Sequence, residues 1–189
     1  TSMSIATPLM TAEQFLALPE DGMERELIRG ELKERPMTVR NQYHAEVMAI
    51  VSQRLRNWLE SLPAASGKVY AGDVGCILQR DPDLVVGIDV AYFSEHALSQ
   101  ASSATTLLEG APVLAVEILS PSDTQENIVE KVDNYLSAGT ALVWLIDPHF
   151  RTVTVYRADR TIETFDHTRT LTVEPHLPGF AVAVPKLFG

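Results

Sequence analysis

The chain carries only one cysteine, Cys76, among its 189 residues. A single thiol excludes a disulfide within the chain and a zinc site built from several thiolates, and it is typical of a reducing compartment. Long apolar runs are also absent, because no stretch approaches the ~18 to 20 residues that a membrane helix needs. No charged and then apolar leader precedes Thr11, so we expect a cytoplasmic protein that is not inserted in a membrane.

The sequence also lacks linkers, internal repeats and low-complexity tracts. Its hydrophobic content of 46% over 189 residues is enough for one sizeable core. We therefore expect a single domain over residues 1–189. Residues 1–10 are expected to be a flexible segment, in which Thr1 and Ser2 precede Met3 as a remnant of cloning.

Positive charge is scarce, because 15 lysines and arginines face 25 aspartates and glutamates and leave a net charge of −10. Avid non-specific binding to nucleic acid relies on cations that neutralise phosphates, so this balance argues against it without excluding a nuclease. One N-terminal group of cations is interleaved with glutamates: Arg25, Arg29, Lys33, Arg35 and Arg40. The pattern indicates either a solvated charged hairpin, the commoner case, or a surface that follows phosphates.

Two acidic residues interrupt apolar runs that are typical of buried strands. Asp89 lies within residues 87–93, and Glu117 lies within residues 113–119. Such runs are usually buried on both faces of a sheet, where an unpaired carboxylate is costly. Two intrusions of this kind indicate a shared cation. The five histidines have no metal-ligand spacing, which argues against zinc.

A helix is predicted over residues 124–138. Asp123 and Glu126 have the spacing of a capping box at its start, and Gly139 ends it. Its apolar side chains recur at the spacing of an amphipathic helix: Ile128, Val132, Tyr135 and Leu136.

Lys131 flanks this apolar stripe and is the only basic residue over positions 81–150. Its ammonium could therefore extend past the edge of the core towards Asp89 and Glu117. The alternative, which the helix pattern alone favours slightly, is a snorkelling lysine whose stem covers apolar surface while its charge stays in water. An aspartate, a glutamate and a lysine are together the set that a metal-dependent phosphodiester hydrolase needs.

The remaining pattern predicts a mixed sheet with helices on its faces. A short helix is expected over residues 11–17 and a long one over residues 41–61, where His44 continues the apolar stripe one turn earlier. Strands are expected near residues 25–28, 31–35, 70, 74–78, 89–93, 113–119, 142–146, 152–156 and 161–165. The first two should form a hairpin that turns at Arg29 and Gly30, and the last two should form a second hairpin.

Several motifs, each weak alone, occur in an order and spacing that are specific together. They are residues 26–32 (ELIRGEL), the helix beginning near His44, residues 89–93 (DVAYF), residues 116–123 (VEILSPSD), Lys131, residues 144–148 (WLIDP) and residues 177–180 (LPGF). From about Thr11 to Phe188, the chain resembles the Uma-type family of putative restriction endonucleases, within the PD-(D/E)XK nuclease superfamily.

The resemblance implies an α/β fold with a mixed sheet, in which a restriction-endonuclease-like αβββαβ core carries an added N-terminal hairpin and a C-terminal β-hairpin. Asp89 and Glu117 match the family's motif aspartate and glutamate, and both would bind metal together with the backbone carbonyl of Ile118. One or two Mg²⁺ ions, with Mn²⁺ as a substitute, suit such oxygen ligands. Lys131 would orient the attacking water or stabilise the developing negative charge.

Three positions depart from the family pattern. The superfamily's lysine normally lies two residues after the glutamate, where this chain has Leu119, so Lys131 would be its relocated equivalent. Ile88 replaces a proline before Asp89 that shapes the turn and carries no chemistry. Asn127 stands where family members often have an aspartate, which could weaken a second metal site.

Two further residues are candidates for the site. Glu31 resembles the family's first acidic residue and would complete the metal shell; the alternative is a strand glutamate that faces solvent. His44 is either a site residue or a packed and hydrogen-bonded histidine, which is the commoner case.

The sequence therefore predicts a Mg²⁺-dependent endonuclease that hydrolyses phosphodiester bonds of DNA through Asp89, Glu117 and Lys131. The alternative, which the acidic composition favours, is a non-catalytic descendant of the fold that acts as an oligomeric binding or regulatory domain. Because cutting both strands of a duplex needs two active sites, we expect a homodimer that uses apolar surface near residues 152–165. The choice between DNA and RNA, the sequence specificity and the number of metal ions are left open.

Overall fold

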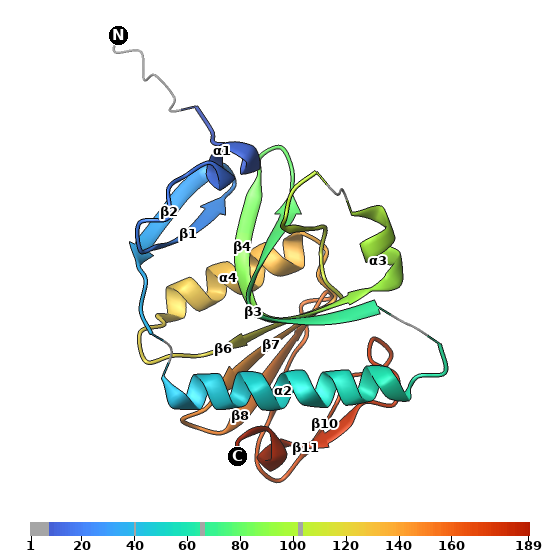
Figure 1. Ribbon diagram of the computed structural model, residues 1–189. Coiled ribbons are helices and arrows are strands. Elements are labelled where there is room, and N and C mark those ends of the chain that lie inside the picture. Colours follow the sequence, from blue (N-terminus) through green and yellow to red (C-terminus); the bar gives the residue numbers. More distant parts are fainter. Residues whose placement is uncertain (1–7, 40, 65–66, 102–103) are drawn as a thin grey trace.

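The computed structural model describes residues 8–39, 41–64, 67–101 and 104–189 (Figure 1). Its helices are α1 (Ala12–Leu16), α2 (Gln42–Ser61), α3 (Glu95–Gln100), α4 (Gln125–Ser137) and a 3-10 helix, η1 (Val184–Leu187). Its strands are β1 (Met23–Ile28), β2 (Glu31–Pro36), β3 (Gly67–Gln79), β4 (Leu84–Ser94), β5 (Leu108–Glu109), β6 (Leu114–Ile118), β7 (Leu142–Asp147), β8 (Thr152–Arg157), β9 (Ile162–Phe165), β10 (Thr170–Thr172) and β11 (Ala181–Ala183). No helix in these ranges is long and apolar enough to cross a membrane.

One nine-stranded sheet organises the chain. Its strands follow the order β2-β1-β4-β6-β7-β8-β9, while β3 pairs with β4 and β5 pairs with β3. The pairs β6–β7 and β3–β5 are parallel and the other pairs of this sheet are antiparallel. The elements α2, β3, β4, β6, α4 and β7 reproduce the expected αβββαβ order, extended by the hairpins β1–β2 and β8–β9. The predicted mixed α/β fold is therefore confirmed.

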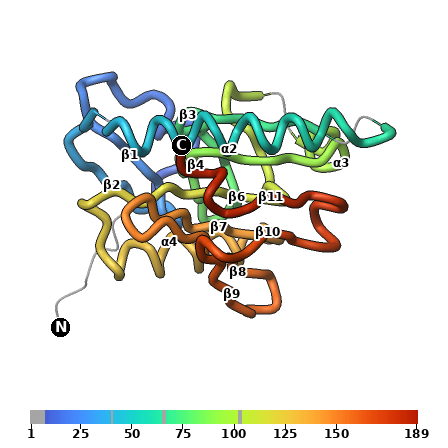
Figure 2. The backbone as a smooth tube through the Cα atoms, turned by 90° about the horizontal axis from the view of Figure 1, so that it is seen from below, coloured from blue at the N-terminus to red at the C-terminus, as the bar shows by residue number. Residues whose placement is uncertain are grey.

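The helices α2 and α4 cover opposite faces of the central strands (Figure 2). The side of α2 that packs on the sheet is the predicted stripe, formed by Val47, Val51, Leu55 and Trp58. On the other face, α4 contributes Val132, Tyr135 and Leu136 to a second cluster with Ala115, Val143 and Leu145. Because β6 and β7 are covered on both faces, they consist almost entirely of apolar residues, and Glu117 is the exception within β6.

The strand β4 changes the face to which its side chains point at Asp89. Ile88 and Ala91, three residues apart, both belong to the cluster under α4, whereas strict alternation would place them on opposite faces. The neighbouring strand β3 has one extra residue at this point, because Ala71 pairs with Val90 and Val74 with Ile88. This β-bulge bends the pair and turns the Asp89 side chain out of the regular alternation.

Both predicted long helices lie within one residue of their expected bounds. The capping prediction for α4 was wrong by one residue, because the side chain of Thr124 accepts the hydrogen bond from the backbone N–H of Asn127. Asp123 instead accepts a hydrogen bond from the N–H of Ser120 at 2.7 Å and closes the loop that precedes the helix. Gly139 follows the helix with φ of 103°, as a C-terminal glycine should.

The N-terminal hairpin turns where the sequence predicts. Arg29 and Gly30 both have positive φ, 53° and 81°, which is the conformation of a two-residue turn that matches the twist of its strands. Beside this turn, Met10, at the end of the segment predicted to be flexible, donates a hydrogen bond to the carbonyl of Gly30 at 2.8 Å. Residues 1–7 and Arg40 lie outside the described residues.

Candidate active site

Asp89 and Glu117 lie where two neighbouring strands separate. The antiparallel ladder of β4 and β6 consists of the pairs Tyr92–Leu114, Ala91–Ala115 and Val90–Val116. Asp89 and Glu117 are the next residues on the two strands. Here the Asp89 carboxylate, through Oδ2, accepts a hydrogen bond from the backbone N–H of Ile118 at 2.8 Å. The two acidic residues thus lie on adjacent strands, just past the end of their shared ladder.

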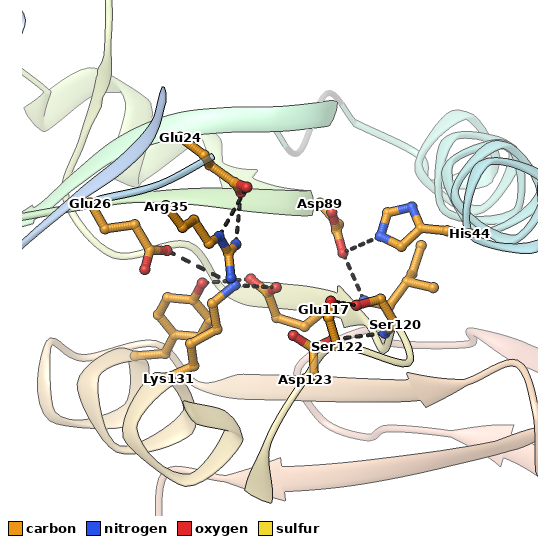
Figure 3. Close-up of polar contacts among 12 residues, drawn as sticks. Glu24, Glu26, Arg35, His44, Asp89, Glu117, Ser120, Ser122, Asp123 and Lys131 are labelled. Atoms are coloured by element: carbon orange, nitrogen blue, oxygen red, sulfur yellow. Dashed lines mark hydrogen bonds and ion pairs between the residues drawn. The ribbon is translucent and has the colours of Figure 1, made fainter. Parts of the chain in front are cut away.

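Asp89 is held by His44 as well as by this backbone N–H (Figure 3). The distance from His44 Nε2 to Asp89 Oδ2 is 3.1 Å, and both side chains are buried. His44 reaches this position because it continues the apolar stripe of α2 one turn before Val47. Burial would raise the pKa of Asp89, but the hydrogen bonds from His44 and Ile118 hold it below its ordinary value. Asp89 is therefore ionised at neutral pH.

Glu117 is held by two side chains from α4. The Lys131 ammonium donates to Oε2 at 2.8 Å, and the Tyr135 hydroxyl donates to Oε1 at 2.5 Å. Glu117 is only 6% exposed, and burial is the main reason why its pKa rises to about 7. The nearby charge of Asp89 raises this pKa further, whereas Lys131 opposes the rise. The two carboxylates therefore differ, with Asp89 the more acidic.

Lys131 points into this cluster. Its ammonium also lies 3.9 Å from Oε1 of Glu26 on β1, so it bridges acidic residues of two strands. Burial lowers the pKa of Lys131, but the charges of Glu117 and Glu26 outweigh burial and keep the ammonium protonated. A snorkelling lysine would keep its charge in water. The contacts with Glu117 and Glu26 contradict that alternative.

A hollow of about 210 Å³ opens beside Glu117 and Lys131. Its walls come from β1, β2, β6 and α4. Cations of the hairpin also line it, but they pair with carboxylates: Arg35 with Glu24 at 2.7 Å and Lys33 with Glu130 at 2.6 Å. These ion pairs favour a solvated charged hairpin over a surface that follows phosphates.

The structure does not bring Glu31 to the cluster. In the hairpin register Glu26 lies opposite Lys33, while Glu31 lies opposite Ile28, two positions closer to the turn. Glu31 is exposed at the start of β2, and it does not line the hollow beside Glu117. The strand glutamate nearest to Lys131 is Glu26 instead.

Sequence reasoning missed Glu26 and Tyr135 as parts of the site. The helical period places Tyr135 on the apolar face of α4, and it is fully buried there. The sequence could have indicated its hydrogen bond to Glu117. A buried tyrosine hydroxyl needs a partner, and Tyr135 lies one helical turn after Lys131 on the same side of α4. Glu26 had no comparable signal, since its approach to Lys131 depends on how the hairpin folds over α4.

Comparisons with known proteins agree with this architecture. Residues 12–185 match the Uma2 family, whose description is "Putative restriction endonuclease". The chain belongs to this family. A solved structure described as a putative nuclease belonging to DUF820, from Anabaena variabilis ATCC 29413, shares the fold with a TM-score of 0.76. It is 24% identical and the alignment covers 95% of this chain and 97% of that chain. A search of curated proteins finds no match.

In this Uma2-family chain the lysine beside Glu117 is Lys131, which lies on the helix α4. Leu119 occupies the position two residues after Glu117, and its backbone N–H donates to the carbonyl of Ile146. The Lys131 ammonium nevertheless reaches Glu117 from α4, 14 residues later in the chain. The cation beside Glu117 therefore comes from α4 and not from the position two residues after Glu117, which is Leu119.

The donor set fits a hard divalent cation. Asp89 and Glu117 offer carboxylate oxygens, and the Ile118 carbonyl belongs to the same strand end as Glu117. Within the described residues, no group of three or more histidine, cysteine, aspartate or glutamate side chains could hold a metal ion. Mg²⁺ keeps several waters and is often bound by only one or two carboxylates, so a small oxygen set suits it.

Glu117 makes the stability of the metal-free protein depend on pH. Its pKa of about 7 in the folded chain lies above the ordinary 4.5, so the unfolded chain loses this proton at lower pH. The contribution of Glu117 to stability is therefore present below about pH 4.5 and is lost as pH rises through 7.

Between pH 5 and pH 8, the free energy of unfolding of the wild type in EDTA should fall by about 2 kcal/mol more than that of Glu117→Gln. Urea unfolding at both pH values measures this difference. Parallel pH profiles for the two proteins would contradict the raised pKa.

Proposed function

We propose that this protein is a Mg²⁺-dependent endonuclease that hydrolyses phosphodiester bonds of DNA. The observation that carries the proposal is the pair of buried carboxylates at the separating strands, Asp89 and Glu117, with Lys131 Nζ 2.8 Å from Glu117. Membership of a family described as "Putative restriction endonuclease" supports a nuclease and favours DNA as the substrate.

Asp89, Glu117 and the backbone carbonyl of Ile118 would hold the Mg²⁺ ion, with Mn²⁺ as a substitute. When bound, such a cation supplies a water of lowered pKa and a positive charge beside the phosphate. The chain orients both carboxylates in advance, because His44 and the Ile118 N–H fix Asp89 while Tyr135 fixes Glu117. Partners of this kind orient metal ligands and raise affinity.

Lys131 would act on the reacting phosphate. Its ammonium is protonated and lies at the wall of the hollow, so it can donate hydrogen bonds to the attacking water or to a phosphate oxygen that gains negative charge. Glu117 holds the ammonium in place, and Glu26 lies at 3.9 Å on its other side. A charge positioned before the reaction costs no reorganisation when the transition state forms.

One observation favours a second candidate, a non-catalytic binding or regulatory domain. Both oxygens of Glu117 already bond to partners in the chain, Lys131 and Tyr135. A satisfied network of this kind can stabilise a fold without any chemistry. Removal of the Lys131 charge distinguishes the two candidates, because only the nuclease would lose an activity.

Lys131→Met keeps the stem and removes the charge, so it should lower DNA hydrolysis by roughly 10²-fold, as the loss of one preorganised electrostatic donor does. Glu117→Gln should have at least as large an effect. Lys33→Met is the matched control, because Lys33 lines the same hollow but pairs with Glu130. Gel assays with single-stranded, duplex and supercoiled DNA, with Mg²⁺ or with EDTA, measure this.

Cleavage that persists unchanged in Lys131→Met and Glu117→Gln, or that ignores EDTA, would rule out this site. An equal loss in Lys33→Met would show a general charge effect. If the wild type has no activity and Lys131→Met changes only stability, the non-catalytic domain becomes the better description.

We also propose a homodimer, because one active site cuts one strand and closed two-fold dimers are the commonest assemblies. Ile162 on the hairpin β8–β9 is 61% exposed, and Phe150 just before β8 is 73% exposed. Light scattering should give twice the 20.8 kDa mass of the chain at micromolar concentration. Ile162→Glu should shift the protein towards the monomer, and a monomeric wild type would exclude the proposal.

A further inference from the structure

A second hollow lies between α2 and the C-terminal segment that contains β11 and η1. It measures about 320 Å³, and its polar lining comes from Arg54, Asn57, Ser61 and Lys186. No acidic residue is among its described lining residues, whereas several line the hollow beside Glu117. Trp58 forms part of its wall and donates a hydrogen bond to the carbonyl of Pro178 at 2.9 Å.

The two cations of this hollow differ from most cations of the chain. Arg25, Lys33 and Arg80, for example, all bond to carboxylates. Among the residues that the structure describes, neither Arg54 nor Lys186 forms an ion pair. In a chain with a net charge of −10, two unpaired cations facing one hollow form a local positive site.

Arg54 has a buried donor that calls for an acceptor. Its Nε atom is buried and has no hydrogen-bond partner in the described part of the chain. A buried hydrogen-bond donor without an acceptor is costly, more so when it belongs to a cation. The planar fork of arginine matches two oxygens of a phosphate, and the lysine ammonium adds a point charge.

We propose that this hollow binds a phosphate of the nucleic-acid backbone away from the bond that is cut. The proposal rests on the nuclease function proposed above. Arg54 donates two hydrogen bonds to the phosphate and Lys186 contributes a second positive charge. The side-chain amide of Asn57, in the same lining, supplies a further donor.

The helix α2 carries residues of both places, His44 of the candidate active site and Arg54 of this hollow. His44, which bonds to Asp89, and Arg54 are on this helix ten residues apart, or about 15 Å along its axis. One strand of duplex DNA advances ~3.4 Å per nucleotide along its axis, so this separation corresponds to roughly four or five nucleotides. The proposal requires the nucleic-acid backbone to follow α2 over this separation, from the strand end that carries Asp89 to Arg54.

Binding of a labelled 20-base-pair duplex in EDTA, followed by fluorescence anisotropy, tests this proposal without any catalysis. Arg54→Gln and Lys186→Gln should each weaken binding about tenfold and lower the slope of affinity against salt by about 0.9 on logarithmic axes. Arg56→Gln is the matched control, because Arg56 is exposed on the same helix and lies outside the hollow. It should bind like the wild type, and all three variants should keep the wild-type circular dichroism spectrum.

Wild-type affinity in Arg54→Gln would overturn the proposal, as would an equal loss in Arg56→Gln, which would mean diffuse surface charge. Inorganic phosphate tests whether the hollow binds a free anion instead of the nucleic-acid backbone. If it raises the melting temperature of the wild type but not of Arg54→Gln while both bind DNA equally, the hollow takes a free oxyanion and the proposal fails. If the wild type binds no DNA, the proposed substrate itself is wrong. If the wild type and Arg54→Gln bind and cut DNA equally, only the proposed phosphate site is wrong.

Discussion

The cost of keeping two carboxylates out of water governs the centre of this molecule. Asp89 and Glu117 are buried side by side where β4 and β6 separate, and each would be destabilising without partners. His44 supplies one partner from α2, and Lys131 and Tyr135 supply two from α4. Because the two helices cover opposite faces of the sheet, both faces must be packed correctly before the pair is satisfied. Fold and candidate site therefore depend on the same contacts.

Much of this arrangement can be predicted from the sequence. Asp89 and Glu117 stand out because they interrupt apolar strands, and Lys131 stands out as the one cation over positions 81–150. The stripes of α2 and α4 have the helical period, so their bounds and buried faces could be predicted closely. His44 could be placed on the buried side of α2 for the same reason, although its bond to Asp89 could not. Local sequence patterns thus identified α2, α4, most strands of the large sheet and the three central residues.

The remainder depends on tertiary contacts that leave little trace in local patterns. The bulge in β3 that turns Asp89 out of register has no apolar signature, and the hairpin register decides that Glu26, and not Glu31, approaches Lys131. The N-cap of α4 is Thr124 and not the predicted Asp123, because Asp123 bonds to Ser120 in the preceding loop. The short elements α3, β5, β10, β11 and η1 were not predicted, because segments of two to six residues carry little periodic signal.

Thermal unfolding with Mn²⁺ at pH 8 tests most directly whether Asp89 and Glu117 form a cation site. At this pH Glu117 is ionised, since its pKa is about 7. An ion that binds only the folded chain raises the melting temperature, by about 5 °C or more at a concentration one hundred times its dissociation constant. We expect this rise in the wild type and in Arg56→Gln, and no rise in Asp89→Asn or Glu117→Gln. Equal rises in all four proteins would contradict the site, whatever activity the protein has.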